Sequence, residues 1–357
     1  MQSEKLLEVI KALKFEVLTI LESYDISIDE QAAQALEIID AMFERLNLAV
    51  EDVIPEDMLS SYFQGVDEAS NLLNSVGITP VGGTVASYSN QSVRDAFKKQ
   101  VHMAAVGEVT ENTMLDLQAA IRTSQQNAYF TLKTTLEEVK SELQGGVIRG
   151  NAKRKVTAKV AEAFVKDGLT AFVTVDGKKL PLDFYSETVV RTNLKDANVK
   201  GATNRNLEND IELVQIHERS DGCAECAKYD GMVVSLTGEH EGYPTVNEAP
   251  LPPRHPNCRG SVRPYVLKFK TEQEIEQDKE RWENFDPEKD IRSKRDKRAY
   301  EEQQARNRKS NYEKKRYAEI KSVLGDDAPK TLGAFKRMKR SRSSGYKELM
   351  KKYQKAE

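Results

Sequence analysis

The sequence predicts an α+β fold that is mostly helical. Apolar residues recur every three or four positions through most of the first 145 residues, which is the spacing of amphipathic helices. Between residues 168 and 267, short runs rich in Val, Ile and Leu are separated by turn residues and are typical of strands. From about residue 271 the composition is again helical, but basic and poor in large apolar side chains. We therefore expect a small mixed β domain, followed by a basic helical C-terminal arm.

The N-terminal helices are predicted from their apolar stripes. The first stripe consists of Leu6, Ile10, Leu13, Val17 and Leu21. Pro55 is expected to begin a new helix, because the first turn of a helix does not use the amide that proline lacks. The longest helical run covers residues 110–143 and ends at Gly145 and Gly146. These segments form an acidic helical region.

The strand-like runs suggest a hairpin and a small sheet. Residues 172–175 and 179–182 flank Asp176-Gly177, a dipeptide that suits a tight hairpin turn because glycine tolerates positive φ. Three further runs lie at residues 211–216, 232–236 and 261–267. Pro264 cannot donate to a sheet ladder, so the last run is expected at an edge.

Length and charge suggest how the chain is divided. The 357 residues fit about two folded units plus an extension, at about 150 residues per domain. The changes in composition and apolar pattern along the chain predict an acidic helical domain (1–145), an α+β domain (146–270) and a basic arm (271–357). The net charge of −3 conceals −12 over residues 1–150 and +13 over residues 291–357. The two ends should therefore have different partners.

Membrane and secretory classes are not supported by the sequence. No run approaches the roughly 18 apolar residues of a membrane helix, and the N-terminus lacks a basic region followed by an apolar one. We expect a soluble chain without a secretion signal or a membrane partner. Three cysteines are too few, and odd in number, for a disulfide framework.

All three cysteines belong to a pattern typical of a metal site. Cys223 and Cys226 are separated by two residues, and after 28 further residues His255 and Cys258 have the same spacing. Three thiolates and one imidazole form a ligand set that suits tetrahedral zinc. Such a closed set has no open position for a substrate, so the zinc would be structural and would staple the β domain. The alternative is that the cysteines are reduced, partly buried hydrophobic residues and that His255 bonds a backbone carbonyl.

Catalytic interpretations fit less well. The pair His217-Glu218 lies only five residues before Cys223, whereas zinc deaminases need His-x-Glu well upstream of Cys-x2-Cys. The two-residue cysteine spacing alone would suit a redox pair, but no thioredoxin-like β-α-β pattern surrounds it. We therefore expect no enzyme and assign no catalytic residue. His102 is expected on a helix surface, whereas Trp282 and Phe285 should pack the first helix of the arm.

The region from 168 to 266 resembles a known family. The matching segments, in order, are LDFY (182–185), VRT (190–192), DIELVQIH (210–217), CAEC (223–226), DGMVVS (230–235) and PRHPNCR (253–259). Their order is similar to that in phage minor capsid and head-morphogenesis proteins related to the F protein of phage Mu. The string His255-Pro-Asn-Cys258-Arg is the most specific of these matches.

The resemblance implies a low-copy virion component in the capsid interior or at the portal vertex, made in the host cytoplasm. Such a protein would act in head assembly, DNA packaging or genome delivery. Its expected partners are the portal protein, the major capsid protein, or both, and packaged double-stranded DNA bound through residues 291–357. A zinc-knuckle nucleic-acid-binding protein of the host cytoplasm is the alternative. It is less favoured because the acidic first 150 residues would repel DNA.

Overall fold

The computed structural model describes residues 2–81, 100–144 and 152–356. Contacts divide the described parts into two compact units, each assembled from separate stretches of chain. The sheet unit comprises residues 1–3, 52–116 and 188–304, and the bundle unit comprises 4–51, 117–187 and 305–357. Each unit draws on all three regions that the sequence suggested, whereas the predicted ranges 1–145, 146–270 and 271–357 are continuous.

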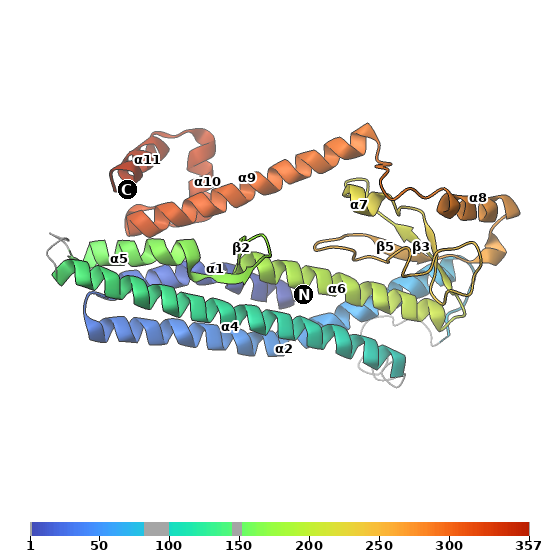
Figure 1. The fold of residues 1–357 in the computed structure, drawn as a ribbon, viewed down its shortest axis with the longest axis horizontal. Coiled ribbons are helices and arrows are strands. Elements are labelled where there is room, and N and C mark those ends of the chain that lie inside the picture. Colours follow the sequence, from blue (N-terminus) through green and yellow to red (C-terminus); the bar gives the residue numbers. More distant parts are fainter. Residues whose placement is uncertain (1, 82–99, 145–151, 357) are drawn as a thin grey trace. The chain divides into compact units, whose positions relative to one another are not determined.

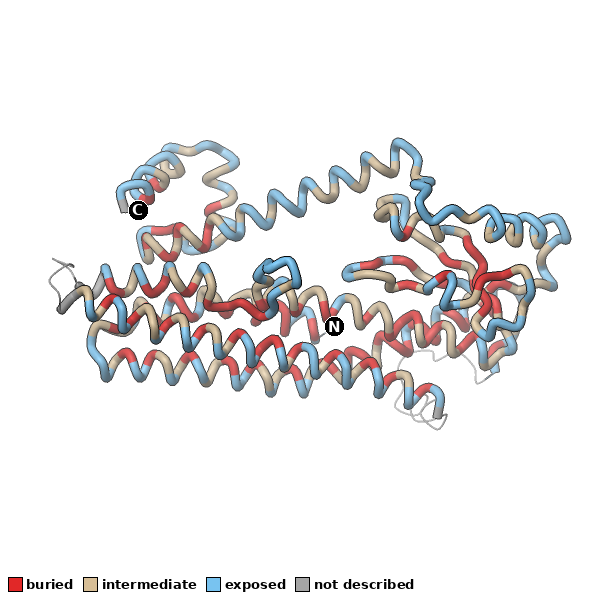
Figure 2. Tube along the Cα trace, in the orientation of Figure 1, coloured by how far each residue is buried: buried red, intermediate tan, exposed pale blue. Residues whose placement is uncertain are grey.

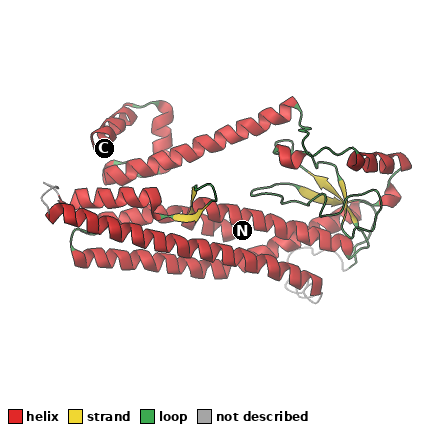
Figure 3. Cartoon of the chain, viewed as in Figure 1, coloured by secondary structure: helices red, strands yellow, loops and turns green. Residues whose placement is uncertain are grey.

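Long helices dominate the fold (Figures 1 and 3). The first are α1 (Gln2–Ser23), α2 (Asp29–Ser75) and α4 (Gln100–Gln144). The predicted stripe of α1 is buried as expected, with Leu6, Ile10, Leu13, Val17 and Leu21 each at most 4 % exposed. Helix α4 includes the predicted run 110–143, while Gly145 and Gly146 lie outside the described residues. No helix in the described parts of the chain is both long and apolar enough to cross a membrane.

The predicted helix start at Pro55 is wrong. Pro55 lies inside α2, a helix of 47 residues, although a proline inside a helix removes one backbone hydrogen bond. The residues on either side explain why the helix continues. Val50, Ile54, Met58 and Tyr62 follow one another at four-residue intervals, and all four are fully buried. Packing of this continuous stripe outweighs the local preference of proline.

The predicted hairpin is confirmed. It follows α5 (Ala152–Ala163) and one π-helical turn, η1 (Phe164–Gly168), and consists of β1 (Thr170–Val173) and β2 (Lys179–Pro181). The strands are antiparallel, with Phe172 opposite Leu180. The turn places Gly177 at a φ of 79°, which glycine adopts without steric cost.

Helix α6 (Leu182–Leu207) packs closely against α2 within the sheet unit. Two glycines permit this approach. A Cβ atom on Gly65 would lie 1.8 Å from the backbone oxygen of Asn198, and one on Gly201 would lie 2.0 Å from that of Tyr62. Because no side chain fits at either position, the two helix backbones are in direct contact.

The second sheet has three short antiparallel strands in the order β4-β3-β5. They are β3 (Leu213–His217), β4 (Val233–Ser235) and β5 (Ser261–Pro264). Pro264 ends an edge strand, as predicted. The fold class is α+β and mostly helical, as predicted, and both described sheets are antiparallel. The β1–β2 hairpin and the three-stranded sheet fall in different compact units. Helix α6 intervenes in the sequence and is about 39 Å long at 1.5 Å per residue.

The sheet is covered by small aliphatic residues and by two aromatics from the segment that follows. Val214, Ile216 and Val234 are fully buried in its core. Trp282, in α8 (Glu272–Glu283), and Phe285 stack on each other at 5.5 Å and pack against the same core. The packing role predicted for these two residues is thereby confirmed, and their target is the sheet.

The C-terminal region is helical, as predicted, but it is more than a solvated arm. It contains α9 (Lys294–Leu324), α10 (Leu332–Ser341) and α11 (Ser344–Ala356). The end of α9 and the two following helices enclose a core of Tyr317, Ile320, Leu324, Ala328, Phe335, Leu349 and Tyr353, and much of the earlier part of α9 is exposed (Figure 2). A few aromatic side chains therefore organise a segment whose composition is dominated by charge.

Candidate metal centre

The first cysteine pair is positioned by a single helical turn. Cys223 is the N-cap of α7 (Ala224–Ala227), with extended backbone angles, and its carbonyl accepts a hydrogen bond from the amide of Ala227 at 3.0 Å. Cys226 lies within that turn and is buried, whereas Cys223 is half-buried. A change from extended to helical backbone over three residues brings both sulfur atoms to the same side of the turn.

The second pair lies in a tight turn before β5. The amide of Cys258 donates to the carbonyl of His255 at 3.0 Å, and Asn257 adopts a left-handed conformation with a φ of 62°. The amide of Asn257 donates to the hydroxyl of Thr192 in α6 at 3.2 Å. This hydrogen bond attaches the turn to α6.

The four predicted ligand residues are brought together. The Nε2 atom of His255 lies 3.1 Å from the sulfur of Cys223 and 3.1 Å from that of Cys226. The sulfur atoms of Cys226 and Cys258 are 3.4 Å apart, and all three cysteines are free thiols. A tetrahedral zinc ion would place its sulfur and nitrogen ligands about 3.5 to 3.8 Å apart, only a few tenths of an ångström more. The four residues therefore lie close enough to hold a metal ion.

The imidazole of His255 is oriented so that Nε2 can serve as a metal ligand. Its Nδ1 atom lies 2.9 Å from the carbonyl oxygen of Pro256, which can only accept, so Nδ1 carries the proton. The other ring nitrogen, Nε2, then faces the cysteine sulfurs. Metal-bound histidines commonly have their other ring nitrogen held in this way.

A hydrogen bond between two of the thiols shifts their pKa values in opposite directions. Hydrogen bonding from the Cys226 thiol, assisted by the amides of Gly260 and Arg254, lowers the pKa of Cys258 to about 5. The same bond, together with burial, raises the pKa of Cys226. One thiolate is thus stabilised by groups that also hold the turn, and a thiolate is the form that binds metal.

Glu218 is the residue that sequence reasoning missed as part of this cluster. Its carboxylate, Cys226 and Cys258 form a second set of donor atoms within 4.8 Å of one another, overlapping the set of Cys223, Cys226 and His255. The side chain of Glu218 is 4 % exposed, and burial raises its pKa. The sequence signal was its place one residue after β3, which brings it to the loops that carry the cysteines.

Arg254 compensates the buried charge of Glu218. The two side chains form an ion pair at 2.5 Å, and that of Arg254 is 8 % exposed. The guanidinium also donates to the carbonyl of Pro250 at 2.7 Å and lies 4.5 Å from the centre of the Tyr229 ring. Because it immediately precedes His255, this residue connects the metal-binding turn to the sheet unit.

His102 is not on a helix surface, so that prediction is wrong. The residue is 2 % exposed in the sheet unit, with Nδ1 2.6 Å from the hydroxyl of Tyr62 and Nε2 3.0 Å from Glu208. Both ring nitrogens are satisfied by side chains distant in sequence, which no local pattern could reveal. Burial raises the pKa of Tyr62, so its hydroxyl stays protonated. The hydrogen bonds of His102 with Tyr62 and Glu208 therefore have a structural role between packed helices.

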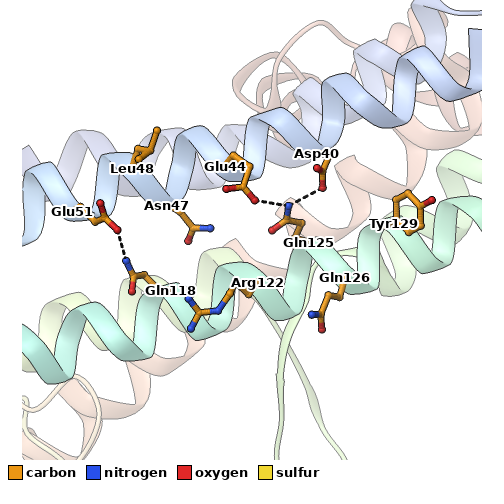
Figure 4. A pocket seen from close by; sticks show the side chains of 10 residues that line it. All are labelled: Asp40, Glu44, Asn47, Leu48, Glu51, Gln118, Arg122, Gln125, Gln126 and Tyr129. Carbon is orange, nitrogen blue, oxygen red and sulfur yellow. Dashed lines mark hydrogen bonds between the residues drawn. The ribbon is translucent and has the colours of Figure 1, made fainter.

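A groove lies in the bundle unit, between α2 and α4 (Figure 4). It is an acidic groove of about 550 Å³ in which Asp40, Glu44 and Glu51 face α4. Gln125 donates to Asp40 at 2.7 Å and to Glu44 at 2.9 Å. Amide donors thus occupy part of the acidic lining.

Comparison with known families now places the chain in a class. The family model for phage minor capsid protein 2 matches residues 26–340, which include most of both compact units. The chain therefore belongs to the phage minor capsid protein 2 family, and it is a virion-related protein of the capsid class. Searches of curated proteins and of solved structures gave no match. The relationship to the F protein of phage Mu stays a prediction.

Proposed function

We propose that this chain is a low-copy structural component of the phage head, located at the portal vertex or in the capsid interior. In this role it contacts the portal protein, the major capsid protein, or both, and acts in head assembly, DNA packaging or genome delivery. The observation that carries the proposal is the family match over residues 26–340, because it extends through both compact units rather than one isolated motif.

Zinc in the Cys223, Cys226, His255 and Cys258 cluster is part of the proposal. The cluster is supported by its donor chemistry and by sulfur and nitrogen atoms 3.1 to 3.4 Å apart. Zinc would link the loop after β3 to the loop before β5 and so stabilise strands of only three to five residues. With four ligands from the protein, the ion would have a structural role.

A non-catalytic role follows from the same argument. A closed ligand set has no position for a substrate, and the carboxylate of Glu218 is neutralised by Arg254 within a buried pair. We accordingly propose no enzymatic activity.

The charge distribution supports two kinds of partner. The −12 of residues 1–150 suits contact with another protein, and the +13 of residues 291–357 suits packaged double-stranded DNA. Like-charge repulsion disfavours the opposite assignment. The chain would be made in the host cytoplasm and then incorporated into the head.

Genetics of the phage that encodes the chain tests this function. A null mutant should still form shells but produce particles defective in genome retention or delivery, and the full-length protein should co-purify with portal or shell protein. Fully infectious particles at normal yield would overturn the proposal. Sequence-specific DNA binding by the purified chain, combined with normal particles from the null mutant, would instead support a zinc-knuckle protein of the host cytoplasm.

A further inference from the structure

We infer that one exposed face of the α10–α11 hairpin is the surface that contacts DNA phosphates. We call it the hairpin face and define it by Arg337, Arg340, Arg342, Lys347, Lys351 and Lys355, all of which are exposed. The inference rests on the proposed function and deepens it, because it assigns the DNA contact to 25 residues of the basic C-terminal region.

Charge is concentrated in this hairpin. Residues 332–356 contain nine basic residues and one acidic residue, a net charge of +8. Residues 294–324 of α9 contain eleven basic and five acidic residues, a net charge of +6 over a longer stretch. The two short helices therefore have the higher positive charge density, which is the property that attracts a polyanion.

Ion pairing divides the cations of the hairpin into two groups. Lys336 and Lys339 lie 3.9 and 3.4 Å from Glu313 of α9, and Lys352 lies 3.5 Å from Asp327. These three charges are partly neutralised within the bundle unit. By contrast, the six side chains of the hairpin face have no ion-pair partner among the residues that the structure describes.

Helix periodicity explains why the six cations point away from the core. Lys347, Lys351 and Lys355 follow one another at four-residue spacing, so they form one stripe about 12 Å long on α11. Leu349 and Tyr353 occupy the opposite side and are buried at 5 % and 4 % exposure. One side of α11 thus packs the core and the other presents ammonium groups.

The turn between the helices and α10 add further exposed cations. Arg342 caps α10 in a left-handed conformation with a φ of 48°, a position at which glycine is most common. Its presence places an exposed guanidinium between Arg340 and the first turn of α11. Arg337 lies one turn before Arg340, while Phe335 is buried on the other side of α10.

Nucleic acid fits this surface better than a membrane does. A membrane-binding amphipathic helix needs an apolar face to insert, but Phe335, Leu349 and Tyr353 are already buried in the core of the hairpin. The exposed charged residues of α10 and α11 are lysines and arginines apart from Glu348, and lysines and arginines contact phosphates without reading base sequence. We therefore expect sequence-independent binding to double-stranded DNA.

The test compares two full-length variants with equal loss of charge. The first replaces the six residues of the hairpin face with Gln. The second replaces six exposed basic residues of α9, namely Lys294, Arg295, Arg308, Lys309, Lys314 and Lys315, with Gln. The affinity for a random-sequence 30-base-pair duplex is measured by fluorescence anisotropy over a series of salt concentrations.

The hairpin variant should bind at least about tenfold more weakly at 0.1 M salt, and its salt slope should flatten by up to about five if all six side chains contact phosphates. The α9 variant should change much less. A third variant that exchanges Lys and Arg at the same six positions should retain affinity, which shows that charge, and not a folding defect, causes the loss.

Equal losses of affinity in the two Gln variants, or a larger loss in the α9 variant, would overturn the inference. The proposal that the chain binds DNA would still stand. If the unmodified protein fails to bind the duplex, the DNA partner of the proposed function fails as well. If the hairpin variant keeps its DNA affinity but no longer self-associates, the surface instead binds a second copy through the acidic groove of α2 and α4.

Discussion

Two small cores in this chain are stabilised in different ways. The sheet core is formed by strands of three to five residues and by small aliphatic side chains such as Val214 and Val234. The C-terminal core is formed by helices and by large aromatic side chains such as Tyr317 and Phe335. Strands this short are marginal without further support, whereas helices can bury a continuous stripe.

The difference shows where a metal would matter. The loop after β3 and the loop before β5 bring three thiols and one imidazole together at one end of the sheet, so a single ion could join them. The C-terminal helices have no cysteine or histidine and depend on packing, capping and ion pairs with α9. We expect the sheet unit to be sensitive to metal removal and the α9–α11 core to be insensitive.

Breaking the metal cluster should have the largest effect. Purified protein should contain about one zinc per chain, and Cys226→Ser should release it, because apparent binding energies of structural zinc reach about 10 kcal/mol or more. Hydrogen exchange in residues 211–267 should accelerate about a thousandfold or more, while the α9–α11 core is unchanged.

The control for this prediction is Ala227→Ser, which lies beside Cys226 but outside both donor sets. It should keep its zinc and its slow exchange. Metal-free protein with unchanged exchange across the sheet would contradict the zinc assignment.

Truncating the aromatic centre of the other core should have the next largest effect. Phe335 is fully buried, so Phe335→Ala should lower the free energy of unfolding of the C-terminal helices by about 3 to 5 kcal/mol. Zinc content should not change. Tyr312→Ala removes an aromatic residue that is 60 % exposed and should cost less than about 1 kcal/mol. A similar response to both substitutions in hydrogen exchange would show that Phe335 does not organise this core.

The buried ion pair offers a smaller change in the sheet unit. Arg254→Ala leaves Glu218 buried without its partner and should destabilise the sheet unit by about 3 kcal/mol in chemical denaturation. The cost comes from an unpaired buried charge. The double variant Arg254→Met, Glu218→Leu removes both charges, so it should regain most of the stability that Arg254→Ala loses. A double variant less stable than Arg254→Ala would argue that the pair itself contributes net stability.

Removing one helix cap from each core should have the smallest effects, and the two effects should be similar. The hydroxyl of Thr271 accepts from the amide of Glu274 at 3.2 Å, and that of Thr331 accepts from Ala334 at 3.1 Å. Each Thr→Ala substitution should cost about 1 kcal/mol, with faster hydrogen exchange confined to the first turns of α8 and α10 respectively. Thr→Ser at either site should be nearly neutral, and loss of protection in the other core would contradict independent stabilisation.

Much of the secondary structure could be predicted because its signals are local. The stripe of α1, the turn at Gly177 and the edge position of Pro264 each depend on a few neighbouring residues. The convergence of Cys223 and His255 was also predictable, since the two-residue spacing in each pair limits where the ligand atoms can point.

The errors concern features that depend on tertiary packing. Pro55 remains helical because the stripe around it is fully buried, and His102 is buried because Tyr62 and Glu208 satisfy its ring. Glu218 joins the cluster through the fold of the loops, and its spacing from Cys223 gave no sign of this. The core around Phe335 was not predicted either, because its partners Tyr317 and Ile320 come from α9.

The most direct test of the central claim is the protein composition of purified, DNA-filled virions of the phage that encodes this chain. Quantitative mass spectrometry should detect the chain in every preparation, at a copy number comparable to that of the portal protein and far below that of the major capsid protein. Its absence from virions, with portal and major capsid proteins present in normal amounts, would contradict a role as a structural component of the head.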